Sequence, residues 1–300
     1  MLLLCGGTGL LGGRIAERLA EQRVPFRALV RDGSTFEPPG ADVVRGDLRD
    51  PASLDAALAG VDTVVTTVTA MTRLLAGGEK TTIDATDNHG TRNLIEAAER
   101  AGVTRFLYIS FAAIQPQDSY PLGRAKWENE ERLRASTMRE IILKPDAFQE
   151  VWLGPAVKIE LEKGRMIVFG RGDNPIPYVA VDDVAEAAVR ILVAADPPRS
   201  LAFGGPEALT RNEVASRLGR ALGREPKVRH VPRTVLRLGS RVLAPVKQEV
   251  ASVMALSLIN DTRTATWDDR PLRELGIEPR PASAFIEQAA ADARSRRGTP

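Results

Sequence analysis

An apolar run that ends in glycines opens the chain: Leu2-Leu3-Leu4-Cys5-Gly6-Gly7-Thr8-Gly9-Leu10-Leu11-Gly12. Its apolar part predicts a buried strand, and the pattern over residues 11–22 predicts a helix directly after it. Glycines at such a junction permit a tight turn, a close approach of a ligand to the backbone and close packing of the helix. The stretch therefore predicts a dinucleotide site with the pyrophosphate at the helix amino end, and an ordinary tight turn is the alternative. The residues expected to hold the cofactor here are Gly6, Thr8, Gly9, Leu10, Leu11 and Gly12.

Apolar runs and helical patterns alternate over the first half of the chain. This alternation predicts parallel strands joined by crossover helices, and therefore an α/β, doubly wound sheet of the Rossmann type. Beyond Lys144 the alternation ends, and prolines punctuate loops before further helical patterns, which predicts a smaller, mostly helical C-terminal lobe. We expect an NAD(P)-binding domain over residues 1–145 and a substrate or partner lobe over residues 146–300, interleaved with the sheet. The expected strands are Leu2–Cys5, Phe26–Val30, Val43–Arg45, Thr63–Thr67, Arg105–Ser110 and Glu140–Lys144, and the expected helices are Leu11–Gln22, Pro51–Ala59, Ala85–Ala101, Leu122–Ala135 and Asp183–Ala195.

The end of the second expected strand favours NADP(H) over NAD(H). About 20 residues past the glycines, an acidic side chain accepts from the ribose hydroxyls, whereas a basic one holds a 2′-phosphate. Arg31 occupies this place, and Asp32 after it either turns outward or competes for the ribose, so NAD(H) stays the alternative. After the third strand come Asp47 and Leu48, where Asp47 either accepts from the adenine amino group or closes the turn before the next helix. Thr67, at the end of the fourth strand, completes the cofactor-binding residues expected along this edge.

Composition narrows the class of protein. Of the 300 residues 43% are apolar, one is cysteine, and the net charge is +2, too small to indicate a polyanionic partner for the whole chain. A single cysteine forms no internal disulfide, and neither a signal-like amino end nor an apolar run of membrane-spanning length is evident, so we expect a cytoplasmic protein. His89 and His230 lack cysteine or carboxylate partners at ligand spacing, so no metal site is expected.

Seven motifs follow one another along the chain. They are Gly6–Gly12, Arg31, Gly46-Asp47-Leu48, Asn88–Ile95, Phe106–Ser110, Lys144–Glu150 and Pro177–Ala185. In this order they resemble the atypical short-chain dehydrogenase/reductases of the NmrA-like branch, and the C-terminal half is similar to complex I accessory-subunit-like members. The resemblance covers most of the chain and implies a bound nicotinamide dinucleotide. It also implies that Phe148 and Trp152 lie beside the nicotinamide, with core packing as the alternative.

The catalytic residues of that family are only partly present. Its active members use a Tyr as general acid four residues before a Lys, and a Ser or Thr orients the carbonyl. Lys126 fits the Lys position, but Leu122 stands at the Tyr position and Phe111 at the Ser position, with Ser110 one residue early. Since alternate strand residues face opposite sides, we expect Ser110 to point away from a substrate. Tyr120, six residues before Lys126, reaches the site only if the helix starts after it.

Two functions are compatible with these residues. In the first, the chain is an NADP(H)-dependent reductase of a quinone-like or conjugated small molecule, an acceptor that can take its proton from solvent. Lys126 then binds the nicotinamide ribose, or donates a proton because burial lowers its pKa. In the second, the chain is a non-catalytic sensor, assembly or scaffold protein in which the dinucleotide is a structural ligand or redox signal. For Lys126 itself the alternative is a helix-surface lysine paired with Glu130.

A basic segment covers residues 211–247. It holds ten Lys or Arg and two Glu, and many apolar residues follow between Val235 and Ile259. One interpretation is a solvated helical face, and another is a contact surface for acidic lipid head groups or a partner protein. Nucleic acid is the least favoured partner, because the segment nearly lacks aromatic residues for stacking.

Overall fold

The computed structural model describes residues 1–75, 81–160 and 163–297. The chain divides into two compact units. The first unit comprises Met1–Lys144 and Val184–Leu201, and the second comprises Pro145–Asp183 and Ala202–Pro300. The helical segment after residue 183 therefore returns to the first unit.

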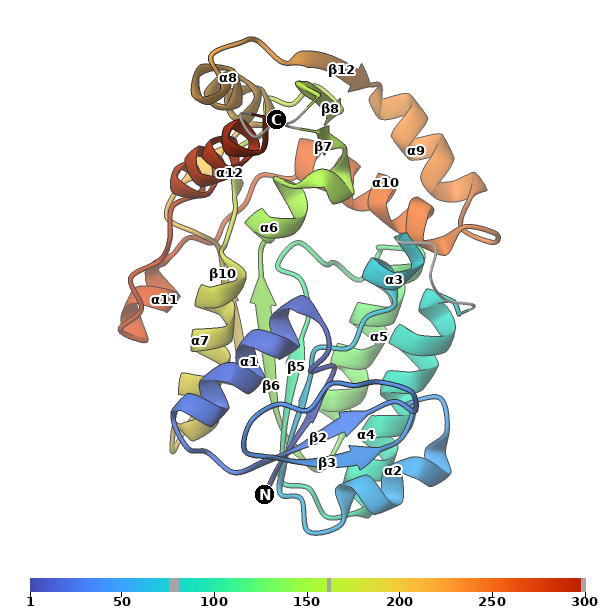
Figure 1. The fold of residues 1–300 in the computed structure, drawn as a ribbon. Coiled ribbons are helices and arrows are strands. Elements are labelled where there is room, and N and C mark those ends of the chain that lie inside the picture. Colours follow the sequence, from blue (N-terminus) through green and yellow to red (C-terminus); the bar gives the residue numbers. More distant parts are fainter. Residues whose placement is uncertain (76–80, 161–162, 298–300) are drawn as a thin grey trace. The chain divides into compact units, whose positions relative to one another are not determined.

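A seven-stranded sheet with the order β10-β6-β5-β4-β1-β2-β3 forms the centre of the first unit (Figure 1). The pairs β1/β2, β1/β4, β2/β3, β4/β5 and β5/β6 are parallel. Strand order reverses at β1 and β4, which is the switch point where α/β sheets bind ligands beyond the strand carboxyl ends. The expected doubly wound α/β fold is confirmed. The strands are β1 (Leu2–Cys5), β2 (Phe26–Val30), β3 (Ala41–Arg45), β4 (Thr63–Thr66), β5 (Arg105–Ile109), β6 (Arg139–Pro145) and β10 (Ser200–Phe203).

Helices cover both faces of this sheet. On one face lie α1 and α7, joined by an ion pair between Arg18 and Glu186 at 3.7 Å, and on the other lie α2, α4 and α5 (Figure 1). Leu54, Leu94 and Leu133 from the second group enter one core cluster with strand residues. All residues of β1 and β4 are buried, as expected for the centre of a parallel sheet. The helices are α1 (Leu10–Glu21), α2 (Pro51–Leu58), α3 (Met71–Leu75), α4 (Thr91–Arg100), α5 (Pro121–Ala135) and α7 (Val181–Val193).

Two features of this unit depart from the expected elements. All six expected strands are present, but β10 adds a seventh beside β6. The single helix expected over residues 85–101 is instead the π-helix η1 (Asp84–Gly90) followed by α4. A π-helical turn widens the backbone and occurs frequently at functional sites, so η1 directs attention to the residues that it carries.

The second unit is mostly helical, as expected for the C-terminal lobe. Its core includes Met166, Val168, Tyr178, Leu218 and Ile286. Among the described residues, no helix is both long enough and apolar enough to cross a membrane. The helices are α6 (Gln149–Trp152), η2 (Pro155–Val157), α8 (Arg211–Leu222), α9 (Arg233–Val242), α10 (Gln248–Thr262), α11 (Arg270–Glu274) and α12 (Ala282–Arg297). The strands form the sheet β12-β8-β7 (Lys227–Val231, Arg165–Phe169, Ile159–Glu160) and the pair β11-β9 (Ala208–Leu209, Ile176–Pro177).

Candidate functional site

The glycine turn lies at the carboxyl end of β1. Gly6 has a φ of +93°, which L side chains rarely adopt, and its carbonyl oxygen accepts from the Gly9 amide at 2.9 Å. A Cβ on Gly12 would lie 2.1 Å from that oxygen, so only glycine lets α1 approach the turn this closely. Thr67, after β4, donates its hydroxyl to the Gly6 oxygen at 3.2 Å, and Leu11 is buried. Steric requirements at Gly6 and Gly12 therefore determine the shape of the turn.

The outer surface of the turn is open. Thr8 and Gly9 are exposed, and the Leu10 side chain is 51% exposed, which is high for a leucine. The first turn of α1 contains no acidic residue, and its backbone amides carry the positive end of the helix dipole. Arg73 of α3 reaches the turn and donates to the Thr8 hydroxyl at 3.0 Å. This surface of backbone amides and cations fits a pyrophosphate group.

The loop after β2 carries Arg31, which is part-buried. Arg45, at the end of β3, donates its guanidinium to the carbonyl oxygens of Arg31 at 3.2 Å and Ser34 at 2.8 Å. Arg45 thus holds the backbone of the loop in place. The Arg31 side chain lies next to the strand end, and its contact with a 2′-phosphate stays a prediction.

Asp47 closes the turn after β3. Its carboxylate accepts from the Arg49 guanidinium at 2.6 Å and from the Arg49 backbone amide at 2.9 Å, and the Arg49 hydrogen bond lowers the pKa of Asp47. Of the two roles expected for Asp47, these contacts match the turn, although Asp50 is the residue that caps α2. Leu48 is buried, and its carbonyl oxygen accepts from Asn93 at 3.0 Å. Contacts of Asp47 and Leu48 with adenine stay a prediction.

Lys126 is a residue of α5, and its ammonium group lies at the carboxyl end of β5. Its Nζ donates to the Ile109 carbonyl oxygen at 2.6 Å and lies 4.7 Å from the centre of the Tyr108 ring. Burial lowers the pKa of Lys126, and the negative charges of Asp87 and Glu130 oppose that shift. Only β4 separates β1 from β5, so the glycine turn and the end of β5 lie about 10 Å apart on one edge of the sheet. A dinucleotide extends over such a distance.

Asp87 is a residue of this region that the expected set omitted. It lies in η1 and is 1% exposed; one carboxylate oxygen accepts from the Ala70 amide at 2.9 Å, and the other has no hydrogen-bond partner among the described residues. Asn129, one turn after Lys126 on α5, donates to the Asp87 carbonyl oxygen at 2.6 Å and to the Tyr108 hydroxyl at 3.2 Å. These contacts gather Asp87, Asn129 and Tyr108 around the lysine. Asp87 directly precedes the Asn88–Ile95 motif, which is the signal that could have found it.

Glu130 holds a second set of polar groups and is fully buried. One carboxylate oxygen accepts from the Ser110 hydroxyl at 2.5 Å, and the other accepts from Lys144 and from Arg134, each at 2.6 Å. Ser110 therefore points towards α5. The interpretation of Lys126 as a surface lysine paired with Glu130 is wrong, because the Lys126 ammonium contacts the end of β5 instead.

The remaining positions of the usual catalytic set carry no acid. Leu122 lies one turn before Lys126 on α5, and Phe111 follows β5 and is part-buried. Tyr120 precedes α5 in an extended conformation, so the helix does start after it. Its ring packs against Gly123, however, where a Cβ would lie 2.5 Å from the ring carbon Cζ.

Phe148 and Trp152 belong to the second unit. Phe148 precedes α6 and forms a bridge with Val179, while Trp152 packs against the core and accepts from Arg211 at 2.6 Å through its carbonyl oxygen. Trp152 thus serves packing within that unit, whereas the contact of Phe148 with Val179 is made by the backbone. Their place beside a nicotinamide stays a prediction.

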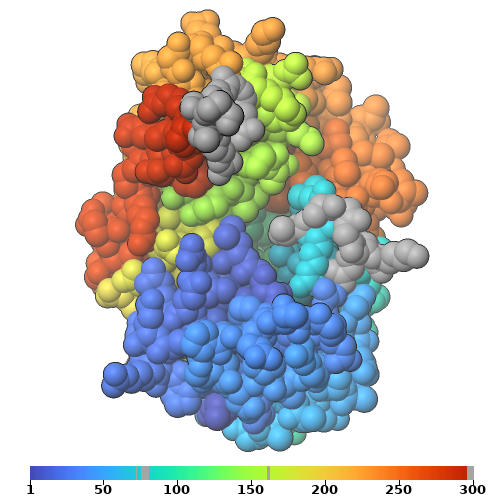
Figure 2. All heavy atoms as spheres, viewed as in Figure 1, coloured from blue at the N-terminus to red at the C-terminus, as the bar shows by residue number. Residues whose placement is uncertain are grey.

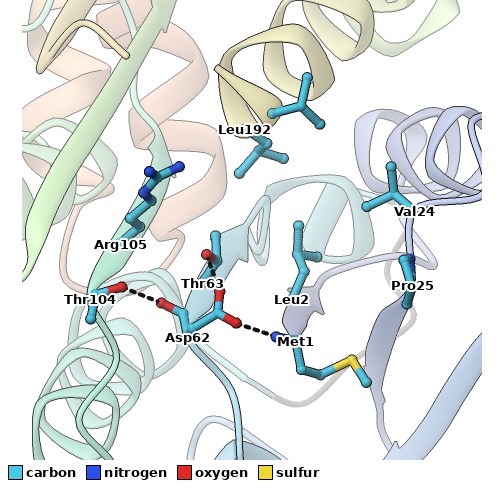
Figure 3. Close-up of a pocket in the computed structure, with 10 residues that line it drawn as sticks. Met1, Leu2, Val24, Pro25, Asp62, Thr63, Thr104, Arg105 and Leu192 are labelled. Carbon is cyan, nitrogen blue, oxygen red and sulfur yellow. Dashed lines mark hydrogen bonds and ion pairs between the residues drawn. The ribbon is translucent and has the colours of Figure 1, made fainter. Parts of the chain in front are cut away.

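A hollow lies at the opposite edge of the sheet, near the amino ends of β1, β4 and β5 (Figure 3). Among its polar residues, Asp62 accepts from the Thr63 hydroxyl at 2.7 Å, from the Thr104 hydroxyl at 3.1 Å through its carbonyl oxygen, and from the Met1 amino group. Leu2, Val24 and Leu192 supply apolar walls. Because ligands of α/β sheets bind beyond the strand carboxyl ends, the glycine turn is the better candidate site.

Comparison with known proteins agrees with this geometry. Residues 6–195 match a family model described as NAD(P)H-binding. An NAD(P)H azoreductase of Xenophilus azovorans is 32% identical over 78% of each chain, and the photosystem II assembly factor Ycf39 of Synechocystis sp. is 29% identical over 79% of this chain and 72% of its own. The Escherichia coli NADPH-dependent quinone oxidoreductase QOR2, in complex with NADPH, superposes with a TM-score of 0.72 at 20% identity, covering 96% of this chain and 99% of its own.

At 20% identity, the similarity to the QOR2 structure shows only that the two chains share a fold. The family match covers more than half of the chain and begins at the glycine turn. The chain therefore belongs to the NAD(P)H-binding family, and its resemblance to the atypical short-chain dehydrogenase/reductases is confirmed.

Proposed function

We propose that the chain is an NADPH-dependent reductase that transfers a hydride to a quinone-like or otherwise conjugated small molecule. The position of the Lys126 side chain is the main support for this proposal. Its part-buried ammonium group lies at the carboxyl end of β5, on the edge of the sheet that also holds the glycine turn. Leu122 and Phe111 replace the Tyr and Ser on which ketone reduction depends. The site therefore favours an acceptor that can be reduced without a Tyr acid and an orienting Ser.

The residues on this edge fit the cofactor. The amides of the glycine turn and the amino end of α1 would hold the pyrophosphate, Arg31 the 2′-phosphate, and Lys126 the nicotinamide ribose. When bound, NADPH supplies the hydride. The preference for NADPH over NADH is supported by the basic side chain of Arg31, and also by the NADPH named for the structurally similar quinone oxidoreductase.

A conjugated acceptor suits a site with one ammonium group. Addition of a hydride to a quinone places a negative charge on oxygen, and one proton completes the two-electron reduction. Lys126 can stabilise that charge and donate its proton, because burial lowers its pKa and makes it a stronger acid. Asp87 opposes this shift and so favours the protonated lysine. Solvent then returns the proton to Lys126.

Oxidation of NADPH by a panel of benzoquinones, naphthoquinones and azo dyes tests the proposal. We expect turnover with at least one acceptor, and a loss of about 100-fold or more in Lys126→Met, the range of general acid catalysis. Lys163→Met is the control, because Lys163 is an exposed lysine of the second unit that pairs with the nearby Glu160. Wild-type turnover that Lys126→Met leaves intact would remove Lys126 from the mechanism.

A second candidate function is a non-catalytic, NADP(H)-binding assembly protein. The similarity to the assembly factor Ycf39 favours it, as do Leu122 and Phe111 at the catalytic positions. It predicts a cofactor that stays bound through purification and is never oxidised by any acceptor. The same assay therefore separates the two functions.

A further inference from the structure

The helix α9 of the second unit exposes several large apolar side chains. One side of this helix packs on α10: Leu236 is fully buried, and a Cβ on Gly239 would lie 2.3 Å from the Met254 methyl carbon. The helix, orange in Figure 1, lies beside α10 of the same unit, and orange atoms stand at the surface of that unit in Figure 2. Its other sides are open.

Apolar side chains occupy one of the open sides. Val235, Leu238 and Val242 stand at positions i, i+3 and i+7, so they share one face of α9. They are 49%, 65% and 62% exposed, and Val246 in the following turn is 74% exposed. We define these four residues as the α9 stripe. Large apolar residues this exposed usually occur singly on a protein surface, whereas here they form a row.

Positive charge surrounds the α9 stripe. Residues 226–248 contain no Asp or Glu, and their six basic residues are Lys227, Arg229, Arg233, Arg237, Arg241 and Lys247. Arg233 pairs with Asp261. Within the part of the chain that the structure describes, the other five form no ion pair. Arg237 and Arg241, one turn apart, lie on the open side of α9 next to the stripe.

We propose that α9 docks on a lipid bilayer that carries anionic head groups. An apolar stripe beside unpaired cations is the pattern of a helix that lies in the membrane interface, with its apolar side chains among the acyl chains and its Arg and Lys at the phosphates. A partner protein fits less well, because residues 226–250 contain no Phe, Trp or Tyr, the residues that dominate protein interfaces. The docking surface is independent of the proposed reaction.

Vesicle flotation with the purified chain tests this proposal. We expect binding to vesicles of phosphatidylcholine and phosphatidylglycerol in equal amounts, little binding to phosphatidylcholine alone, and weaker binding as salt is raised. Arg237→Glu combined with Arg241→Glu should reduce the affinity at least about tenfold. Leu238→Asp should also abolish flotation, whereas Val193→Asp, at a 58% exposed valine of α7, should not.

Circular dichroism and thermal melting of each variant show that the loss is not unfolding, since all of these side chains are exposed. A folded wild-type chain that fails to float with anionic vesicles would overturn the proposal. Equal flotation of Leu238→Asp and Val193→Asp with anionic vesicles would also overturn the proposal. Self-association in sedimentation velocity that Leu238→Asp abolishes, without vesicle binding, would assign the stripe to a second copy of the chain instead.

Discussion

The glycine turn after β1 and the lysine at the end of β5 lie on the same edge of the sheet but are built differently. At the turn, steric contacts of the backbone determine the structure, because a methyl group at Gly12 would lie 2.1 Å from the Gly6 carbonyl oxygen. At the end of β5, electrostatic contacts set the properties of the Lys126 ammonium group. It donates to the Ile109 carbonyl oxygen, and Asp87 and Glu130 influence its protonation. The proposed cofactor site therefore depends on local shape, whereas the proposed chemistry depends on groups gathered from distant parts of the chain.

Gly12→Ala should have the largest effect. The added methyl group meets backbone rather than a flexible side chain, so α1 must move away from the turn. We expect the affinity for NADPH to fall about 100-fold or more, which corresponds to about 2.7 kcal/mol. Fluorescence titration with NADPH measures this change.

Gly13→Ala is the matched control. Its Cβ would lie 3.4 Å from the Gly7 oxygen, an ordinary contact, and alanine is favoured over glycine inside a helix. This variant should bind NADPH like the wild type and melt at the same or a higher temperature. Equal affinities for Gly12→Ala and Gly13→Ala would show that the turn does not hold the cofactor.

Local sterics also explain why so much of the first unit was predictable from the sequence. Strands such as β1 and β4 are buried on both faces and read as continuous apolar runs, and the glycines stand at the one junction that requires them. The strand β10 escaped prediction, because its short segment Ser200–Phe203 carries an exposed serine at the edge of the sheet.

Lys126, Asp87 and Glu130 form what we call the charge cluster. This cluster was less predictable, because its members do not all lie close together in the sequence. Asp87 and Lys126 are separated by 39 positions, and nothing local to either residue indicates that η1 and α5 bring them together. Ser110 is an exception: the alternation of strand residues indicated its direction, although not that Glu130 would receive its hydroxyl hydrogen. Long-range polar contacts of this kind follow from packing and not from local pattern.

Arg31→Ala should have the next largest effect, on cofactor choice. Loss of one charge-assisted contact, worth about 1.5–3 kcal/mol, should weaken NADPH binding about 10-fold to 100-fold and leave NADH binding unchanged. Arg45→Ala is informative beside it, because the Arg45 guanidinium donates to the backbone of the loop at Arg31 and Ser34. It should weaken both cofactors. Parallel titrations with NADPH and NADH distinguish these results, and an Arg31→Ala chain with unchanged NADPH affinity would contradict the role of Arg31.

Asp87→Asn should change how turnover depends on pH. Removal of a nearby negative charge disfavours the ammonium form, so the pKa of Lys126 should fall further. If protonated Lys126 is the active form, the loss of activity on the alkaline side should then begin at a lower pH. The profile of kcat against pH measures this shift. Asp84→Asn, in the same π-helix but part-exposed, should leave the profile in place; a shift to higher pH in Asp87→Asn would contradict the proposed coupling.

Ser110→Ala should have the smallest effect on turnover. The Ser110 hydroxyl donates to the buried Glu130, not into the candidate site, so its loss leaves a buried carboxylate with one donor fewer. We expect the free energy of unfolding to fall by about 1–3 kcal/mol in urea denaturation while kcat stays close to that of the wild type. The opposite result, unchanged stability with a kcat reduced by orders of magnitude, would place Ser110 in the catalytic machinery. The charge cluster would then act on the substrate directly as well as through Lys126.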